Sequence, residues 1–203
     1  MARTLDDHGV DFIGAREATR YEVYDDGAGV PTIGKGHALT MSEILSGMYE
    51  GIKLTLDQVN ALFRRDLQPR VDGVNKLLGD VQVSQHAFDA LVSFVYNEGV
   101  GALATSDLLK HVRDRDMAGA ADEFAVWNKW RPGGKGPLVP SSGLTLRREM
   151  EKELFLMPDD DVVAFQSLLN RVMASQFDLT QDLPSLNPGQ HILDEDPDTG
   201  GPL

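Results

Sequence analysis

The chain has 203 residues, enough for one medium-sized domain with a substantial core, and it contains no cysteine. Disulfides, thiolate catalysis and thiolate zinc sites are therefore excluded. The formal net charge of -13 would repel nucleic acid, so we expect no nucleic-acid partner.

The first residues predict a helix followed by a β-hairpin. Thr4 with Asp7 has the spacing of a capping box, which favours a helix running to about Arg16. Two β-prone runs, Tyr21 to Tyr24 and Val30 to Ile33, then flank the turn sequence DDGAG. We expect a small β-hairpin lobe over about residues 20–40.

From about residue 52 the pattern becomes helical. Thr55 is expected to cap a helix that kinks or restarts at Pro69, and Ser84 opens the most apolar helix, which ends at Gly99. The remaining predicted segments are two short helices (106–112 and 118–127), a loop (131–143) and a final helix (143–157). The fold class is therefore α+β and mainly helical, with a helical lobe over about residues 52–157.

From Pro158 onward the character of the chain changes. This segment holds nine Asp and Glu residues and one basic residue, Arg171. The start of the segment predicts one amphipathic helix, and the rest, rich in Pro, Gly and acid, predicts an irregular tail. The apolar positions expected on one face of that helix are Val163, Leu168, Val172 and Met173. Residues 158–203 are thus an acidic extension, which either packs on its own domain or docks on a virion or carrier protein.

Membrane insertion is not expected. The sequence contains no run of about 18 apolar residues, which a membrane-spanning helix needs. Near the N-terminus, Asp6 and Asp7 stand where a signal peptide would need an uninterrupted apolar stretch, so we expect no signal peptide.

Three side chains near the hairpin can converge on one site. Glu17 follows the first helix, Asp26 lies in the turn, and Thr32 lies on the returning strand. An acid, a second carboxylate and a hydroxyl are the groups that glycoside hydrolysis requires. From spacing alone, solvated turn acids remain the simpler interpretation, because Asp-Gly is common in turns. A calcium loop would need further alternating oxygen ligands, so we expect no metal.

Three blocks of the sequence resemble the bacteriophage-type lysozymes of glycoside hydrolase family 24. The first is Glu17 and Asp26 followed by TIGKGH, the second is DALVSFVYNEGVGALATSDLL, and the third is GLTLRREMEKELF. The resemblance implies a lysozyme-like domain over residues 1–157, with the active-site cleft between a small β-hairpin lobe and a larger helical lobe. It also implies a cofactor-independent muramidase that acts on peptidoglycan, at the β-1,4 bond between N-acetylmuramic acid and N-acetylglucosamine.

The resemblance assigns the catalytic roles. Glu17 is the general acid, Asp26 holds or activates the attacking water, and Thr32 helps to position that water. It also favours inversion at the sugar carbon over retention. Asp25, next to Asp26, is expected to be a solvated turn residue or a local hydrogen-bonding partner.

Other residues are expected to support the site, each with an alternative. His37 is either a pH-tuned base or a link to the helical module through Asp66. Arg147 or Arg148 either pairs with Glu17 or is a buried structural residue that pairs with Glu151 or Glu22. Arg16 precedes Glu17 where the family usually has an apolar or aromatic residue, and it can alter the pKa of Glu17.

The sequence supports the substrate-binding candidates less strongly than the catalytic ones. Asn97 is either an amide for sugar recognition or a helix cap. Thr105 and Ser106 are either groove hydroxyls or a helix N-cap. Lys35 either contacts an acidic group on the peptide stem of the polymer or is a solvated strand residue.

Three functions remain open at this point. The first is an active endolysin, held in the host bacterial cytoplasm until holin-dependent release to the cell wall. The second is a lysozyme domain carried in a virion or injection machine, with residues 158–203 as a docking element. The third is a lytic transglycosylase, against which the intact Asp26 and Thr32 argue, because that reaction needs no positioned water.

Overall fold

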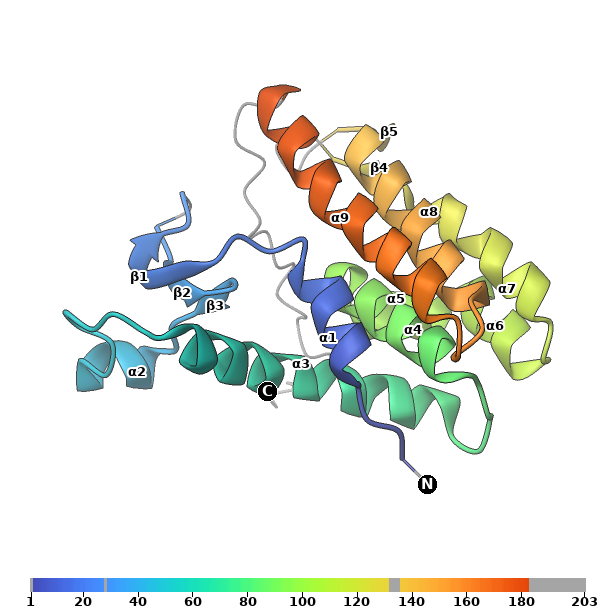
Figure 1. Ribbon diagram of the computed structural model, residues 1–203, viewed down its shortest axis with the longest axis horizontal. Coiled ribbons are helices and arrows are strands. Elements are labelled where there is room, and N and C mark those ends of the chain that lie inside the picture. Colours follow the sequence, from blue (N-terminus) through green and yellow to red (C-terminus); the bar gives the residue numbers. More distant parts are fainter. Residues whose placement is uncertain (1, 28, 132–135, 183–203) are drawn as a thin grey trace, which may run out of the picture.

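The computed structural model describes residues 2–27, 29–131 and 136–182, with a small β lobe and a larger helical lobe (Figure 1). The β lobe contains a three-stranded antiparallel sheet in the order β1-β2-β3. Its strands are β1 (Arg20–Asp25), β2 (Pro31–Gly34) and β3 (His37–Ala38). The mainly helical α+β class and the hairpin are therefore confirmed.

The helical elements follow largely as expected. In chain order they are α1 (Asp7–Gly14), α2 (Met41–Ser46), α3 (Leu56–Leu78), α4 (Gln85–Glu98), α5 (Val100–Thr105), α6 (Asp107–Arg113), α7 (Met117–Glu123), the 3-10 helix η1 (Phe124–Trp127), α8 (Ser142–Leu156) and α9 (Val162–Asp182). The predicted loop 131–143 contains strand β5 (Val139–Pro140), which pairs with β4 (Lys129–Trp130).

Helix caps explain where most helices begin. Thr55 and Ser84 cap α3 and α4 as predicted, each accepting a hydrogen bond from a backbone N–H of the first turn. The predicted cap at Thr4 is wrong. Asp6 is the N-cap instead, with its carboxylate accepting from the Gly9 N–H at 2.9 Å, and α1 ends at Gly14 rather than Arg16. Of the two alternatives at Pro69, a helix that continues and a helix that restarts, the structure shows the first, because α3 runs through Pro69.

Helix α4 is the centre of the helical lobe. Every residue from His86 to Val95 is buried, and the helix packs against α1, α3 and α8. The β lobe has a much smaller core, formed by Ile33, Leu54, Val59 and Leu62. Because α2 buries no residue, polar contacts must hold it in place.

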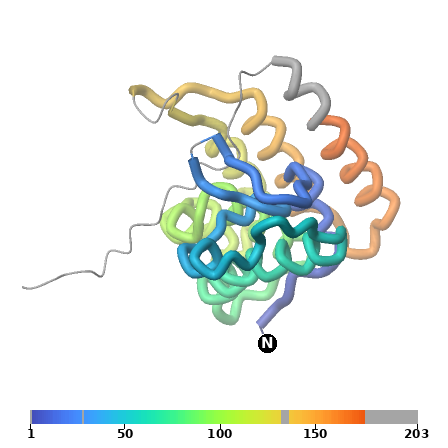
Figure 2. The backbone as a smooth tube through the Cα atoms, turned by 90° about the vertical axis from the view of Figure 1, so that its left-hand side faces the viewer, coloured from blue at the N-terminus to red at the C-terminus, as the bar shows by residue number. Residues whose placement is uncertain are grey.

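Helix α9 packs on its own domain, beside α8 and α1 (Figure 2). Phe165, Leu168 and Val172 are buried in the main core. Val163 is 82% exposed and Met173 is 51% exposed, so placing these two on the buried face was wrong. The buried stripe follows a spacing of three and four residues from Phe165, which aligns one face of a helix. The irregular tail was predicted to begin at Gln181, whereas α9 continues to Asp182, and the rest of that tail, residues 183–203, lies outside the described residues.

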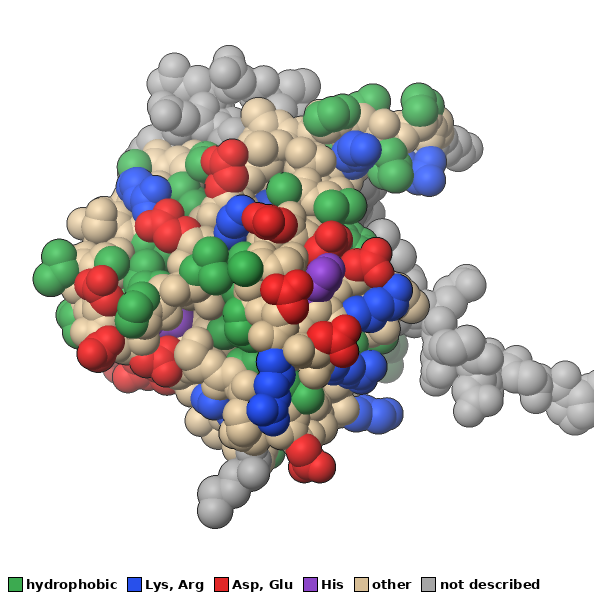
Figure 3. Space-filling view, turned by 90° about the vertical axis from the view of Figure 1, so that its right-hand side faces the viewer, with side chains coloured by type: hydrophobic (Ala, Val, Ile, Leu, Met, Phe, Trp, Pro, Cys, Tyr) green, Lys and Arg blue, Asp and Glu red, His purple; other side chains and the backbone are tan. Residues whose placement is uncertain are grey.

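The surface of the helical lobe carries a mixture of charges. On the face shown in Figure 3, acidic and basic side chains are interspersed with scattered apolar ones. Among the helices of the described ranges, none is both long and apolar enough to cross a membrane.

The burial of α9 predicts a difference between two substitutions on the same helix. Leu168→Ala removes a side chain that is 0% exposed and should lower the free energy of unfolding by about 2–5 kcal/mol. Val163→Ala, at an exposed position, should change it by less than about 0.5 kcal/mol. Urea denaturation of both variants measures the difference, and equal stabilities would show that α9 is not part of the core.

Candidate active site

Glu17 lies just beyond α1, close to the segment that joins β2 and β3. Its N–H donates to the carbonyl of Gly14 at 3.1 Å, so the chain turns tightly after the helix. The side chain is half-buried. A Cβ at Gly36 would lie 3.9 Å from Glu17 Oε2, and Gly36 has a φ of +82°, a conformation that favours glycine. The second glycine of TIGKGH therefore brings the backbone close to the carboxyl group.

The two aspartates of the hairpin have different tasks. Asp25 Oδ1 accepts hydrogen bonds from the N–H groups of Gly27 at 2.7 Å and Gly29 at 3.0 Å, so this side chain shapes the turn. Asp26 closes it, with Oδ1 accepting from the Val30 N–H at 3.1 Å. Asp25 is thus the local hydrogen-bonding partner that the sequence suggested, and Asp26 has a defined place in the hairpin.

Thr32 lies on the central strand β2, opposite Tyr24 of β1. It is 4% exposed, and its hydroxyl donates to the Val30 carbonyl at 3.0 Å. This bond leaves the oxygen lone pairs of Thr32 available as acceptors.

Burial raises the pKa of Glu17, while the nearby cations Arg147, Arg16 and Lys35 oppose that shift. The net direction is upward, so the desolvation of the carboxyl group outweighs the three cations. Tyr24 is close to both carboxylates: burial raises the pKa of its hydroxyl, Arg20 opposes this, and the charges of Asp26 and Glu17 add to it. Such a site favours a protonated Glu17 at a pH where an ordinary glutamate is ionised.

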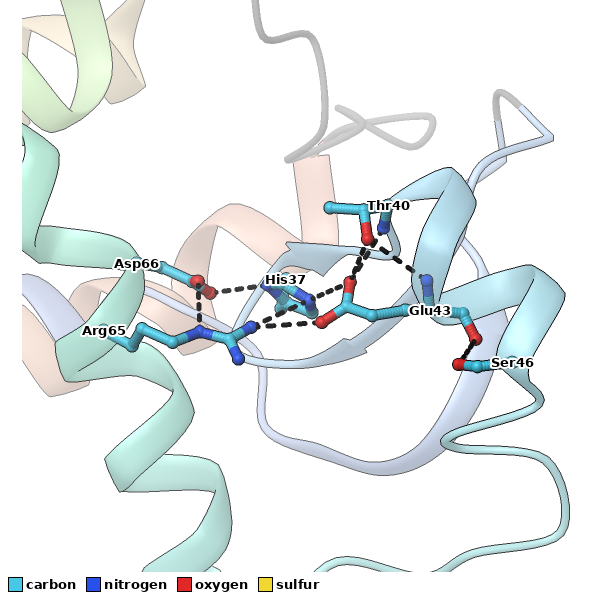
Figure 4. Close-up of polar contacts among 6 residues, drawn as sticks. All are labelled: His37, Thr40, Glu43, Ser46, Arg65 and Asp66. Atoms are coloured by element: carbon cyan, nitrogen blue, oxygen red, sulfur yellow. Dashed lines mark hydrogen bonds and ion pairs between the residues drawn. The ribbon is translucent and has the colours of Figure 1, made fainter.

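His37 ties the β lobe to two helices (Figure 4). Its Nδ1 lies 2.9 Å from Asp66 of α3, and its Nε2 lies 3.1 Å from Glu43 of α2. Glu43 also accepts from Thr40 and Arg65. The predicted contact between His37 and Asp66 is present, and because both ring nitrogens contact carboxylates, the geometry favours a link between modules over a catalytic base.

The titration of this cluster is strongly shifted. The hydrogen bond with Asp66 raises the pKa of His37 despite its burial, and Glu43 contributes in the same direction. Burial alone would favour the protonated form of Glu43. Hydrogen bonds from Thr40 and His37 nevertheless lower the pKa of Glu43 to about 2.

Arg148 is a buried structural residue. It is 1% exposed, and its guanidinium donates to Glu98 at 3.1 Å, to Asn97 at 2.8 Å and to Glu151 at 3.2 Å. Arg147 donates from Nε to Glu151 at 3.1 Å. Of the two alternatives, pairing with Glu151 is therefore the one observed, and within the described chain no ion pair joins either arginine to Glu17. Arg147 acts on Glu17 through its charge instead.

The four substrate-binding candidates differ in exposure and in the contacts that they make. Asn97 is exposed, but its amide oxygen accepts from Arg148, so it is neither a helix cap nor fully available. Thr105 is exposed at the end of α5, with its hydroxyl donating to Gly101. Of the two alternatives for Ser106, the helix cap is the one observed, because Ser106 is the N-cap of α6 and is only 4% exposed. Lys35 is not a freely solvated strand residue, since its Nζ lies 5.3 Å from the centre of the Phe63 ring.

Two residues near Glu17 were missed by sequence analysis. Tyr24 is one, and Tyr96 of α4 is the other: a Cβ at Gly36 would lie 3.7 Å from the Tyr96 hydroxyl. The only available signal for Tyr24 was its place in a hairpin beside Asp26.

A surface groove also lies on the β lobe, but its lining contains none of the predicted catalytic residues. It is lined by Glu22, Val23, Pro31, Leu39, Glu43, Ile44, Gly47, Tyr49, Glu50, Gly51 and Ile52.

A half-buried acid therefore lies at the junction of the β lobe and the helical lobe of a lysozyme-like fold, with a second carboxylate in the adjoining hairpin. The sequence comparison is specific. The phage lysozyme family matches residues 14–151, and the chain belongs to this family.

Relatives of known name support this membership. The endolysin of Bacillus phage B103 is 40% identical over 153 residues, which is 73% of this chain and 52% of that protein, so the chain spans about half the length of that relative. The solved endolysin from Escherichia coli O157:H7 phage FAHEc1 is 34% identical with a TM-score of 0.64, over 77% of this chain and 95% of that one. The muramidase domain of SpmX from Asticaccaulis excentricus is 33% identical with a TM-score of 0.63, over 77% and 99%.

The His37 cluster predicts a pH-dependent contribution to stability. Because the pKa of His37 is above its ordinary value of 6.5, its contribution is complete below that pH and is lost as the pH rises through the folded-state value. Because the pKa of Glu43 falls from 4.5 to about 2, its contribution is complete above pH 4.5 and is lost towards pH 2. His37→Gln should therefore lower the free energy of unfolding by about 1.5–3 kcal/mol near pH 5.5, and by less at pH 9.

Chemical denaturation at several pH values measures this effect. His111→Gln is the matched control, since His111 also lies 2.8 Å from an aspartate, Asp116, but both side chains are solvent-exposed. That control should change stability by less than about 0.5 kcal/mol. A loss from His37→Gln that is independent of pH would contradict the ion-pair interpretation.

Proposed function

We propose that the chain is a muramidase that hydrolyses peptidoglycan at the β-1,4 bond between N-acetylmuramic acid and N-acetylglucosamine. The observation that carries this proposal is Glu17, a half-buried acid whose pKa is raised by burial beside a hairpin that presents Asp26. Its environment suits a proton donor, and Asp26 supplies the second carboxylate from the turn of the hairpin.

The proposed reaction uses these groups in one displacement. Glu17 donates its proton to the glycosidic oxygen, and the bond from that oxygen to the sugar carbon breaks. Water held by Asp26 and Thr32 attacks the same carbon from the opposite face, and its proton passes to Asp26. The sugar configuration is inverted, as expected where the two carboxyl groups are about 6.5–9.5 Å apart with a water molecule between them.

The names of the relatives support the same activity. Several are endolysins, and one solved relative is a muramidase domain. We infer that the chain acts in phage-driven lysis, leaving the host cytoplasm through a holin or travelling in the virion. Helix α9 is consistent with the first route, because Phe165, Leu168 and Val172 pack into the core of its own domain.

Replacement of Glu17 by Gln should lower the hydrolysis rate by about 10²–10⁴-fold without loss of fold, because the amide N–H is too weakly acidic to protonate the glycosidic oxygen. Wild type and the variant are incubated with purified peptidoglycan, and released muropeptides are analysed by mass spectrometry. Glu50→Gln is the matched control, because Glu50 is an exposed glutamate of the β lobe outside the catalytic group.

The products separate the remaining alternatives. Reducing-end muropeptides that incorporate ¹⁸O from labelled water identify hydrolysis, and anhydro-muramic products identify a lytic transglycosylase. Absence of products from well-folded wild type would overturn the enzymatic proposal in favour of a structural role in the virion. The anomer first formed, followed by NMR, distinguishes inversion from retention.

A further inference from the structure

Because Gly36 has no side chain, the Tyr96 hydroxyl and a carboxyl oxygen of Glu17 lie beside the same small space. A Cβ built there would lie 3.7 Å from the Tyr96 hydroxyl and 3.9 Å from Glu17 Oε2. The two oxygens come from distant parts of the chain: Glu17 follows α1, and Tyr96 belongs to the central helix α4. Both thus flank one small space at the surface of the second glycine of TIGKGH.

Tyr96 is held rigidly and remains a hydrogen-bond donor. Its ring packs edge-on against Phe63 of α3, with the ring centres 5.9 Å apart. Burial raises the pKa of its hydroxyl, and the charge of Glu17 is the next largest cause in the same direction. The phenol therefore stays protonated at any pH at which the protein functions, and it can donate one hydrogen bond.

The Tyr96 hydroxyl does not take part in the hydrogen bonding that holds the described fold together. Within the described part of the chain, no protein group accepts a hydrogen bond from the Tyr96 hydroxyl. Half-buried hydroxyls ordinarily find a partner, and the carboxyl group of Glu17 lies beside the same space. Catalytic hydrogen bonds are often long in the free protein and shorten when substrate fills the cleft.

We propose that Tyr96 is a positioning residue for Glu17, donating a hydrogen bond from its hydroxyl to Oε2 of the acid. This bond would leave Oε1 to carry the proton to the glycosidic oxygen. The inference rests on the proposed function, since it assigns Tyr96 a part in proton delivery.

The chemistry of this hydrogen bond predicts the direction in which it shifts the pKa of Glu17. A phenol donates more strongly to a carboxylate than to a carboxylic acid, so the bond strengthens as Glu17 loses its proton. It therefore favours the ionised form and lowers the pKa of Glu17, partly offsetting burial. Other groups act on Glu17 from the surrounding elements and remain in place in a Tyr96 variant. These are Arg147 on α8, Arg16 after α1, and Lys35 between β2 and β3.

The charges that act on Tyr96 itself are also known. Besides Glu17 they are Arg147 on α8, and Arg70 and Asp66 on α3. None of them is removed by Tyr96→Phe, which deletes one oxygen and keeps the ring against Phe63. The variant thus isolates the hydroxyl from the packing.

The test compares Tyr96→Phe with wild type and with Tyr21→Phe, a control at a 39% exposed tyrosine of β1. In Tyr96→Phe we expect kcat to fall about 10-fold with little change in KM. We also expect the basic limb of the kcat profile to move up by about one pH unit, because the ionised acid loses a donor. The ¹³C signal of the Glu17 carboxyl group should titrate at a higher pH than in wild type.

A second variant tests the direction of the pKa shift of Glu17 and keeps the aromatic ring of Tyr96. Fluorinated tyrosine at position 96 is a more acidic donor, so it should move the titration of Glu17 downwards. If the carboxyl signal and the pH profile coincide in all variants, or move the opposite way, the role of Tyr96 is overturned. Lack of hydrolysis by wild type is a different result: it overturns the proposed function, while the carboxyl titration still reports on the hydrogen bond.

Discussion

The partial removal of Glu17 from water is the constraint on which the site depends. Burial raises its pKa even though Arg147, Arg16 and Lys35 lie near enough to lower it. Each pKa unit corresponds to about 1.4 kcal/mol, so the balance between burial and three cations decides whether the acid holds its proton at working pH. The backbone of Gly36 also lies close to the carboxyl group, and its φ of +82° favours glycine at this position.

The buried ions behind the site set geometry more than stability. Glu151 is 0% exposed and accepts from Ser93 of α4 at 2.7 Å as well as from both arginines of its own helix. Desolvating such a cluster costs about as much as the ion pairs return, so it is weak evidence for stability. Its hydrogen bonds join α8 to α4, and α8 also carries Arg147, whose charge acts on Glu17.

Most local signals were read correctly from the sequence, although the cap at Thr4 was not, whereas tertiary proximity was predicted only where a family resemblance supplied it. The caps at Thr55 and Ser84 depend on neighbouring residues, and the contact of His37 with Asp66 followed from a resemblance to a known family. Tyr96 offered no such signal, because its relation to Glu17 depends on how α4 crosses the end of α1. Ser106 was ambiguous for the opposite reason, since a cap and a groove hydroxyl have the same sequence pattern.

Helix α1 connects α9, the helix of the acidic extension, to the segment that carries Glu17. With eight residues it is only about 12 Å long. At its start, the ring of His8 stacks on Phe165 of α9 with the centres 4.3 Å apart, and just beyond its end lies Glu17. A helix this short has little stability of its own and depends on packing at both ends. The contact with α9 therefore helps to hold the segment that carries the acid, which gives a region outside the family match a direct mechanical connection to the site.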